Sequence, residues 1–189
     1  GGDDGAVTLE QLERANLFLV SLDDTHQWYR YHALFAEAMH QYARRRLDEA
    51  DLHDCYEKAS LWYEAQGLLS DAVETALAAQ AYSRAATLID RIITLRKVDN
   101  ELHTLRRWIE QLPGDILRTY PALCLTLARA IFFSSNRRSP ATMARVEEPL
   151  RLAEETWRAN GDWARLGQAL AFRTIAAWWQ GDFDQTFAA

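Results

Sequence analysis

Apolar residues recur at helical spacing through most of this chain, and this pattern limits the fold more than any other feature. From residue 52 onward, segments with apolar residues three and four positions apart alternate with short breaks that contain Gly or Pro. The spacing is clearest before the break at Pro113-Gly114, in Leu102, Leu105, Ile109 and Leu112. A helix with one apolar stripe has to bury that stripe against a neighbour. The sequence therefore predicts successive helix pairs that pack on one another.

Helix-ending and helix-starting residues set the expected bounds of these helices. Gly67 is expected to cap the first helix at its C-terminus, and Asn160-Gly161 ends a later one. Pro121 and Pro140 suit the first turns of two others. The expected segments are 52–66, 71–79, 82–95, 102–112, 123–133, 140–160 and 163–180, with a further helix starting near Phe183.

The helix pairs resemble repeats. AQAYSRAATLI (79–89) and QGDFDQTFAA (180–189) occupy matching places, with a short turn, an aromatic residue and then small residues. Tyr82 and Phe183 lie roughly 100 residues apart, close to three periods of the ~34-residue tetratricopeptide (TPR) unit. Helix pairs that cannot bury a face alone form an α-solenoid. We therefore expect a TPR-like α-α superhelix over residues 51–189.

A different pattern precedes the helices, in NLFLVSLDDTHQWYRYHALF. The apolar runs 17–22 and 28–31 flank a polar break at 23–27, which favours a β-hairpin. A helix then begins, with one apolar stripe in Leu34, Phe35, Ala38, Met39 and Tyr42. This order predicts a partial winged helix over residues 8–50, after a flexible start or tag at 1–7. The expected fold is mostly α, with one β-hairpin.

Charge and cysteine usage narrow the partners and the compartment. The formal net charge is −6, and Asp23-Asp24 stands at the tip of the expected hairpin, which disfavours direct DNA binding. Cys55 and Cys124 are isolated and show no metal-ligand spacing, as expected for reduced thiols in a cytoplasmic protein. No apolar stretch approaches the ~18 residues of a membrane span. We expect no membrane contact.

The residue patterns of catalytic and metal sites do not occur. His32 and His40 lie on one expected helix about 12 Å apart along its axis, too far to share a zinc ion. The chain lacks G-x-S-x-G, and its paired glutamates are most simply solvated helix faces. The sequence therefore predicts no enzyme, and no catalytic, metal or cofactor-binding residues in this chain.

Two adjacent tryptophans stand out near the C-terminus. On a helix, one of Trp178 and Trp179 must point away from the inward stripe. Two interpretations stay open: packing against a following repeat, or a ligand or partner surface that also includes Phe183. We name Trp178, Trp179 and Phe183 as the candidate recognition residues.

The stretch LERANLFLVSLDDTHQWYRYHALFAEAM (12–39) resembles the winged-helix segment of MalT-like transcriptional regulators of the LuxR family. In that family L-x-x-A-N-L-F-L precedes an acidic turn and W-Y-R-Y-H-x-L-F, and both motifs occur here. The segments 59–89 and 105–132 are similar to the helices that follow in the same family. The resemblance weakens after residue 135.

This resemblance implies a place within a larger protein. Such regulators are signal-transduction ATPases with numerous domains (STAND): a nucleotide-binding domain, a winged helix, a superhelical sensor and often a DNA-binding helix-turn-helix. This chain would be the winged-helix end and the truncated start of the sensor. It contains no G-x-x-x-x-G-K-[ST], so ATP is implied only for the parent protein, and DNA only through another domain.

The resemblance also implies a function. Trp28, Tyr29 and Arg30 on the hairpin would dock on the absent nucleotide-binding domain, and an effector bound to the superhelix would release that contact. The effector, a small molecule or a protein, stays open. The alternative is a free-standing TPR-like scaffold for protein–protein interaction.

Overall fold

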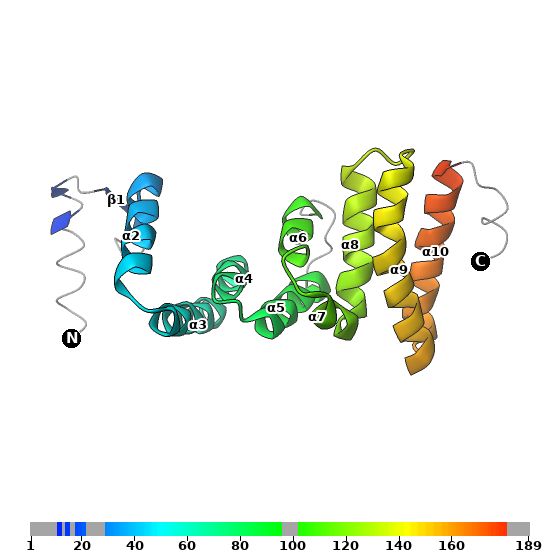
Figure 1. Ribbon diagram of the computed structural model, residues 1–189, viewed down its shortest axis with the longest axis horizontal. Helices are drawn as coiled ribbons and strands as arrows, with labels where there is room; N and C mark the ends of the chain where they lie inside the picture. Colours follow the sequence, from blue (N-terminus) through cyan, green and yellow to red (C-terminus); the bar gives the residue numbers. More distant parts are fainter. Residues whose placement is uncertain (1–10, 13, 16–17, 22–28, 96–101, 181–189) are drawn as a thin grey trace. The chain divides into compact units, whose positions relative to one another are not determined.

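The computed structural model describes residues 11–12, 14–15, 18–21, 29–95 and 102–180, without the side chains of residues 33, 36, 40, 44 and 180. The backbone divides into two compact units, Gly1–Leu52 and His53–Ala189. The described elements are one β-hairpin and a series of helices (Figure 1), so the prediction of a mostly α chain with a winged-helix start is confirmed. The domain ranges 1–7, 8–50 and 51–189 stay predictions.

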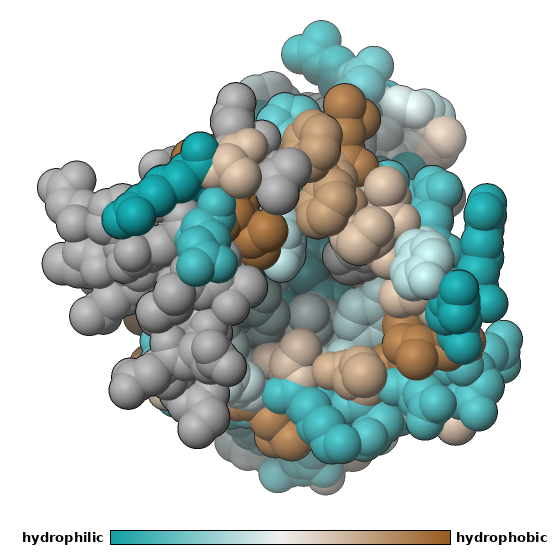
Figure 2. All heavy atoms as spheres, turned by 90° about the vertical axis from the view of Figure 1, so that its left-hand side faces the viewer, coloured by the Kyte–Doolittle hydropathy of each residue, from teal (hydrophilic) through white to brown (hydrophobic). Residues whose placement is uncertain are grey.

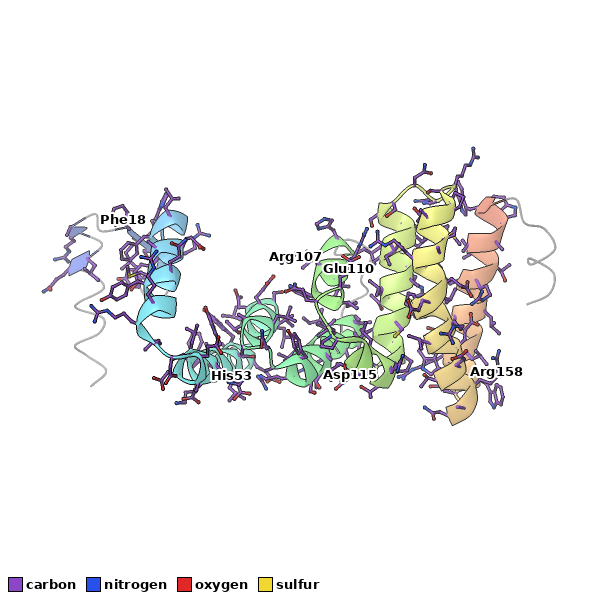
Figure 3. All side chains as sticks on the ribbon, viewed as in Figure 1. Phe18, His53, Arg107, Glu110, Asp115 and Arg158 are labelled. Carbon is purple, nitrogen blue, oxygen red and sulfur yellow. The ribbon has the colours of Figure 1, made fainter. Side chains whose placement is uncertain are left out.

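The first unit is built on the expected hairpin. Strands β1 (Leu19–Ser21) and β2 (Tyr29–Tyr31) pair antiparallel, with Leu19 opposite Tyr31 and Val20 opposite Arg30. Helix α2 (Ala33–Arg46) follows at once. Phe18 lies beside α2 (Figure 3), and its ring stacks on Phe35 with centroids 5.3 Å apart and planes 7° apart. The hairpin is thus attached to the helix by aromatic packing.

Apolar side chains on this unit are largely exposed. Leu19 is buried, but Leu34 is 77% exposed and Tyr42 52% exposed. The expected stripe on α2 is therefore not an inward face among the described residues. An exposed apolar surface of this kind is typical of a site that meets another protein surface.

The second unit is a stack of helices, and α3 (Glu49–Ala65) crosses into it from the first. Pro121 and Pro140 each occupy the first residue of a helix, as predicted. The expected helix 102–112 ends earlier, at Ile109, and Leu112 lies in the following turn. The other helices are α4 (Leu69–Ala78), α5 (Tyr82–Leu95), α6 (Leu102–Ile109), α7 (Gly114–Thr119), α8 (Pro121–Ser134), α9 (Pro140–Asn160) and α10 (Trp163–Gln180).

One turn geometry recurs between helices of the second unit. Gly67, Gln80 and Gly161 all have positive φ, of 76°, 54° and 70°. After each of them the next backbone N–H donates to a carbonyl five residues earlier, at 2.9 Å, which satisfies the end of the preceding helix. The new helix begins two residues after the turn residue, at 69, 82 and 163. Turns this short make consecutive helices neighbours in space.

Helix α8 lies at the centre of the core. It contacts α5, α6, α7, α9 and α10, and Figure 1 shows α8, α9 and α10 side by side. Leu123 and Phe132 on α8 are fully buried, as are Trp108 on α6 and Ile89 on α5. The small residues Ala128, Ala153 and Ala169 have no exposed surface, which lets α8, α9 and α10 approach closely. The TPR assignment stays a prediction.

A polar network ties α3 to α4 and α5. The fully buried Ser60 hydroxyl donates to the Ala72 carbonyl at 2.8 Å and accepts from Arg84 Nε at 2.9 Å. Arg84 also pairs with Glu64 at 2.6 Å. Because every group in this network has a partner, its burial carries no desolvation penalty for an unmet hydrogen bond.

Two exposed glycines allow a matched test of the turn geometry. Gly161→Ala should lower the free energy of unfolding by about 1 kcal/mol, because alanine is strained at φ 70°. Gly167→Ala, in the exposed interior of α10, should raise it by about 0.5–1 kcal/mol through helix propensity. Neither added Cβ meets an atom within 4 Å, so the change in the free energy of unfolding depends on the backbone conformation alone. Urea denaturation measures the free energy of unfolding of both variants. Equal effects would contradict the left-handed conformation of the turn at Gly161.

The two thiols should differ in reactivity. Cys55 is exposed, whereas burial raises the pKa of Cys124 to about 11. At pH 8 only about one Cys124 thiol in a thousand is ionised, and its surroundings exclude reagent. A disulfide reagent such as DTNB should titrate one thiol in the native chain, two in denaturant, and none in native Cys55→Ser. Fast labelling of native Cys55→Ser would show that the core around α8 opens.

Candidate functional site

Aromatic rings meet where α8 ends and along α10. Phe132 and Phe133, near the end of α8, lie 5.3 Å apart in an edge-to-face arrangement. Phe172 on α10 is 5.5 Å from Phe132 and 6.3 Å from Phe133. Trp178 and Trp179 follow on the same helix, with their rings 5.8 Å apart. The rings therefore join two helices that are not consecutive in the chain.

Two arginines lie over these rings. Arg137, in the connection from α8 to α9, places its guanidinium carbon 5.1 Å from the Phe133 ring centroid and 5.0 Å from that of Trp179. Arg129 on α8 lies 5.8 Å from the Phe172 ring centroid. Cations within about 6 Å of an aromatic ring are held by the ring quadrupole. We call this set the arginine–aromatic patch, and it consists of Arg129, Phe133, Arg137, Phe172, Trp178 and Trp179.

The patch is open to solvent although its base is buried. Phe172 is buried, whereas Phe133 is 46%, Trp178 59% and Trp179 38% exposed. Large exposed aromatic rings next to arginine are the composition found where proteins bind other molecules. The rings of this patch are thus both fixed by the core and available for contact.

The positive charge of the patch is not neutralised within the described part of the chain. Neither Arg129 nor Arg137 forms an ion pair with a described carboxylate, although other arginines of the unit do. Burial lowers the pKa of the Arg129 guanidinium, because desolvation disfavours its charged form. The patch therefore presents cations that lack a counter-charge among the described residues.

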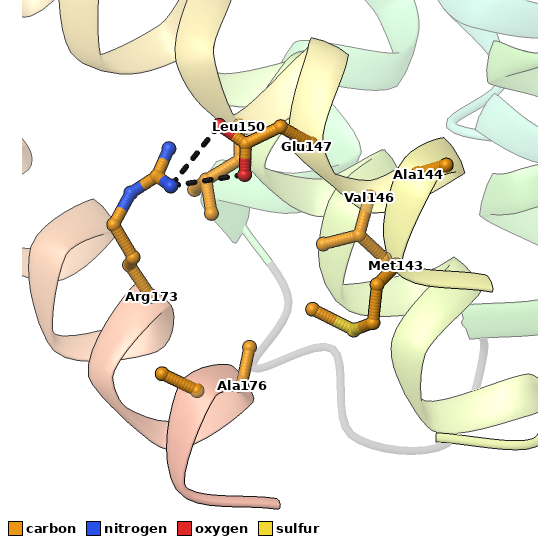
Figure 4. Close-up of a pocket in the computed structure, with 8 residues that line it drawn as sticks. Met143, Ala144, Val146, Glu147, Leu150, Arg173 and Ala176 are labelled. Carbon is orange, nitrogen blue, oxygen red and sulfur yellow. Dashed lines mark hydrogen bonds and ion pairs between the residues drawn. The ribbon is translucent and has the colours of Figure 1, made fainter. Parts of the chain in front are cut away.

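A small pocket between α9 and α10 is a second candidate (Figure 4). It has a volume of about 300 Å³, and its apolar lining includes Met143, Val146, Leu150 and Ala176. Arg173 reaches from α10 to Glu147 on α9 at 2.9 Å and to the buried Glu154 at 2.8 Å. These charges satisfy one another, so the pocket offers mainly apolar contact.

The polar side of α6 is also hollowed, over about 510 Å³. Arg107 and Glu110 lie here (Figure 3), and Glu110 accepts from Arg106 at 2.9 Å and from Arg145 at 2.8 Å. Glu74 accepts from Arg107 and, at 2.7 Å, from Trp108 Nε1. This network is internally paired, in contrast to the arginine–aromatic patch. In Figure 2, hydrophobic and hydrophilic residues are interspersed on the face shown.

The structure places some of the predicted site residues and not others. Trp178 and Trp179 lie in the patch, with Trp179 under Arg137. Phe183 and Trp28 lie outside the described residues. Tyr29 is half-buried on β2 and Arg30 is exposed there, and their docking role stays a prediction.

Sequence reasoning missed four residues of the patch: Arg129, Phe133, Arg137 and Phe172. The available signal was the run Phe132-Phe133 followed closely by Arg137-Arg138, an aromatic pair and a basic pair on either side of a helix end. Nothing in the sequence places that run beside α10, which is about 40 residues further along. Only the packing of α8 on α10 brings the two together.

Two further findings concern the described residues alone. No group of three or more His, Cys, Asp or Glu side chains among them could hold a metal ion. None of the helices in the described ranges has the length and apolar character needed to cross a membrane.

In sequence, the hairpin unit and the stacked helices that follow it are similar to segments of much longer known proteins. Residues 1–51 match the family described as the MalT winged helix domain. The HTH-type transcriptional regulator MalT of Cronobacter sakazakii is 30% identical over 185 residues, which cover 98% of this chain and 20% of that protein. Residues 1–51 thus belong to the MalT winged-helix family, and the chain as a whole is similar to a segment of MalT-like regulators.

A kinase also shares this segment. The serine/threonine-protein kinase PknK of Mycobacterium tuberculosis is 33% identical over 159 residues, which cover 82% of this chain and 14% of that protein. The chain thus spans between 14% and 20% of the length of these relatives. No solved structure matches the chain.

The α9–α10 ion pairs give a prediction about stability. Arg173→Met should lower the free energy of unfolding by about 2–3 kcal/mol, because the 10% exposed Glu154 side chain loses its partner. Glu147→Gln should change it by less than about 0.5 kcal/mol, because Glu147 is 53% exposed. Thermal unfolding followed by circular dichroism compares the two, and a larger effect of Glu147→Gln would contradict this ranking.

Proposed function

We propose that this chain is the regulatory and sensor portion of a MalT-like transcriptional regulator, which couples binding of an effector or partner to activation. The observation that carries the proposal is the order of parts in one chain: a MalT winged helix at 1–51, then a helical unit with an open arginine–aromatic patch. The helical unit would bind the effector or partner, and the hairpin unit would couple that binding to activation.

The exposed apolar surface of the first unit supports the transmitting role. Val20 on β1 and Leu34 on α2 are 54% and 77% exposed, and Arg30 lies opposite Val20 in the hairpin. We propose that a nucleotide-binding domain of the parent protein covers this surface, in contact with Tyr29 and Arg30. ATP would be bound by that domain and DNA by another, and the whole protein would act in the cytoplasm. This chain would perform no catalysis itself.

Coupling requires a difference in affinity between two states. An effector shifts the equilibrium only if it binds the active state more tightly than the inactive state, and a shift from 1:99 to 99:1 needs about 5.5 kcal/mol. An apolar contact the size of the hairpin unit's exposed face can supply energy of that order, because burying one large apolar side chain contributes about 1.5–3 kcal/mol.

A second candidate is a regulatory segment attached to a protein kinase, which the 33% identity with PknK favours. The flanking gene sequence distinguishes the two. The regulator predicts a phosphate-binding G-x-x-x-x-G-K-[ST] motif upstream and a helix-turn-helix downstream, whereas the second candidate predicts a kinase domain in the same reading frame.

The docking role is tested by Leu34→Glu. In the 189-residue chain this change should leave the thermal midpoint within about 1 °C, because the side chain is 77% exposed. In the full-length protein it should raise basal nucleotide hydrolysis about fivefold or more, because a carboxylate would have to be buried in the docked interface.

Gln168→Glu is the control for this experiment. It adds the same charge to an exposed polar position of α10, outside the hairpin unit, so basal hydrolysis should not change. Identical hydrolysis by wild type and Leu34→Glu in the full-length protein would mean that α2 does not dock there.

A further inference from the structure

We propose that the arginine–aromatic patch binds an acidic protein segment that also carries aromatic side chains. This inference deepens the proposed function, on which it rests, because it names the chemical class of partner that the helical unit would sense. Three properties of the patch carry it: continuity, charge and exposed apolar area.

The patch is continuous across two helices and the connection between α8 and α9. Arg129 touches Phe172, and Phe172 touches Phe133. Phe133 and Trp179 both contact Arg137, and Trp178 adjoins Trp179. A partner that reaches any one of these side chains is therefore within reach of the others.

The positive charge of the patch is complementary to carboxylates. Elsewhere in the unit, partly buried arginines are paired with glutamate, as Arg84 is with Glu64 and Arg173 is with Glu154. Within the described part of the chain, Arg129 and Arg137 contact aromatic rings and no carboxylate. A guanidinium held near apolar groups without a counter-ion is energetically costly, and carboxylates of a partner would remove that cost. Arg138 adds a third positive charge and is exposed in the connection that also carries Arg137.

The exposed apolar area of the patch indicates that the partner contributes apolar groups as well as carboxylates. Phe133 and Trp178 are about half exposed, and Trp179 is 38% exposed. An anion alone would leave these side chains in water, whereas aromatic side chains of a partner would stack on them. Binding hot spots combine tryptophan and arginine in this way.

The shape of the patch favours a protein segment over a small molecule. Phe133, Trp178 and Trp179 are 46%, 59% and 38% exposed. Small ligands are bound in cavities that enclose most of their surface. A nucleic acid would need cations spaced along its backbone, and the chain carries a net charge of −6. An extended or helical acidic segment fits an open patch of this composition.

The test measures binding of defined polymers to the 189-residue chain by fluorescence anisotropy. The probe is a labelled random copolymer of glutamate and tyrosine in about a 4:1 ratio, which supplies both carboxylates and rings. Polyglutamate, a lysine–tyrosine copolymer and single-stranded oligothymidylate serve as comparison probes. Circular dichroism checks that each protein variant is folded.

Matched variants assign the binding to the patch. Arg137→Gln and Trp178→Ala should each weaken binding of the glutamate–tyrosine copolymer by about tenfold. Trp178 is 59% exposed, so its removal leaves the core intact. Arg158→Gln removes the same charge at the other end of α9 (Figure 3), roughly 27 Å along the helix from Pro140, and should alter binding less than about twofold.

Several results would overturn the proposal. Equal binding of polyglutamate would remove the role of the rings, and equal binding of the lysine–tyrosine copolymer would remove the role of charge. Tighter binding of oligothymidylate would make the patch a nucleic-acid site. Equal loss in Arg158→Gln, or no binding of the glutamate–tyrosine copolymer, would also refute it. The Leu34→Glu experiment tests the hairpin unit alone. The docking role of that unit and the binding of an acidic segment by the patch can therefore be refuted separately.

Discussion

The burial of helix faces on α8 is the constraint on which the second unit depends. An amphipathic helix is stable in water mainly through the neighbour that covers its apolar face. Short turns with a positive-φ residue precede α4, α5 and α10, and α8 contacts α6, α9 and α10. The polar networks at Ser60, Glu110 and Arg173 follow from this packing, because they lie between helices that the core has already brought together.

The same packing produces the arginine–aromatic patch. Phe132 and Phe172 are buried and anchor the rings, so Phe133 and Trp179 hold their positions although they reach solvent. A rigid aromatic surface loses little conformational entropy when a partner binds. The charges of the α9–α10 pocket differ from those of the patch: Arg173 is paired with Glu147 and Glu154, whereas Arg129 and Arg137 contact aromatic rings and form no ion pair with a described carboxylate.

The first unit differs from the second in how little apolar surface its described residues bury. Its hairpin is a two-stranded ribbon, which is marginal by itself in water. Stacking of Phe18 on Phe35 holds it against α2, but most of the apolar side chains around it remain exposed. Residues 1–51 match the MalT winged helix domain, and under the proposed function another domain of the parent protein would cover this surface. The two units thus differ in kind, since one has its own core and the other shows little buried apolar surface among its described residues.

The amino-acid sequence by itself determined the elements and many of their ends. Gly67 and Gly161 act as caps, and Pro121 and Pro140 begin helices, because φ and hydrogen-bonding preferences are local properties. The turn between the helices 71–79 and 82–95 was also expected, but the positive φ of Gln80 in that turn was not, since glutamine seldom adopts this conformation. Local preference also could not show that the stripe on α2 stays exposed.

Only the tertiary structure decided which side chains form a site. Trp178 and Trp179 drew attention by their type, but Arg137 joins them across a long sequence separation. Ser60 reads as an ordinary helix residue and proves to be fully buried and bonded. Contacts of this kind depend on the rotation and register of packed helices. The sum of many weak interactions sets that rotation and register, and no short sequence motif indicates them.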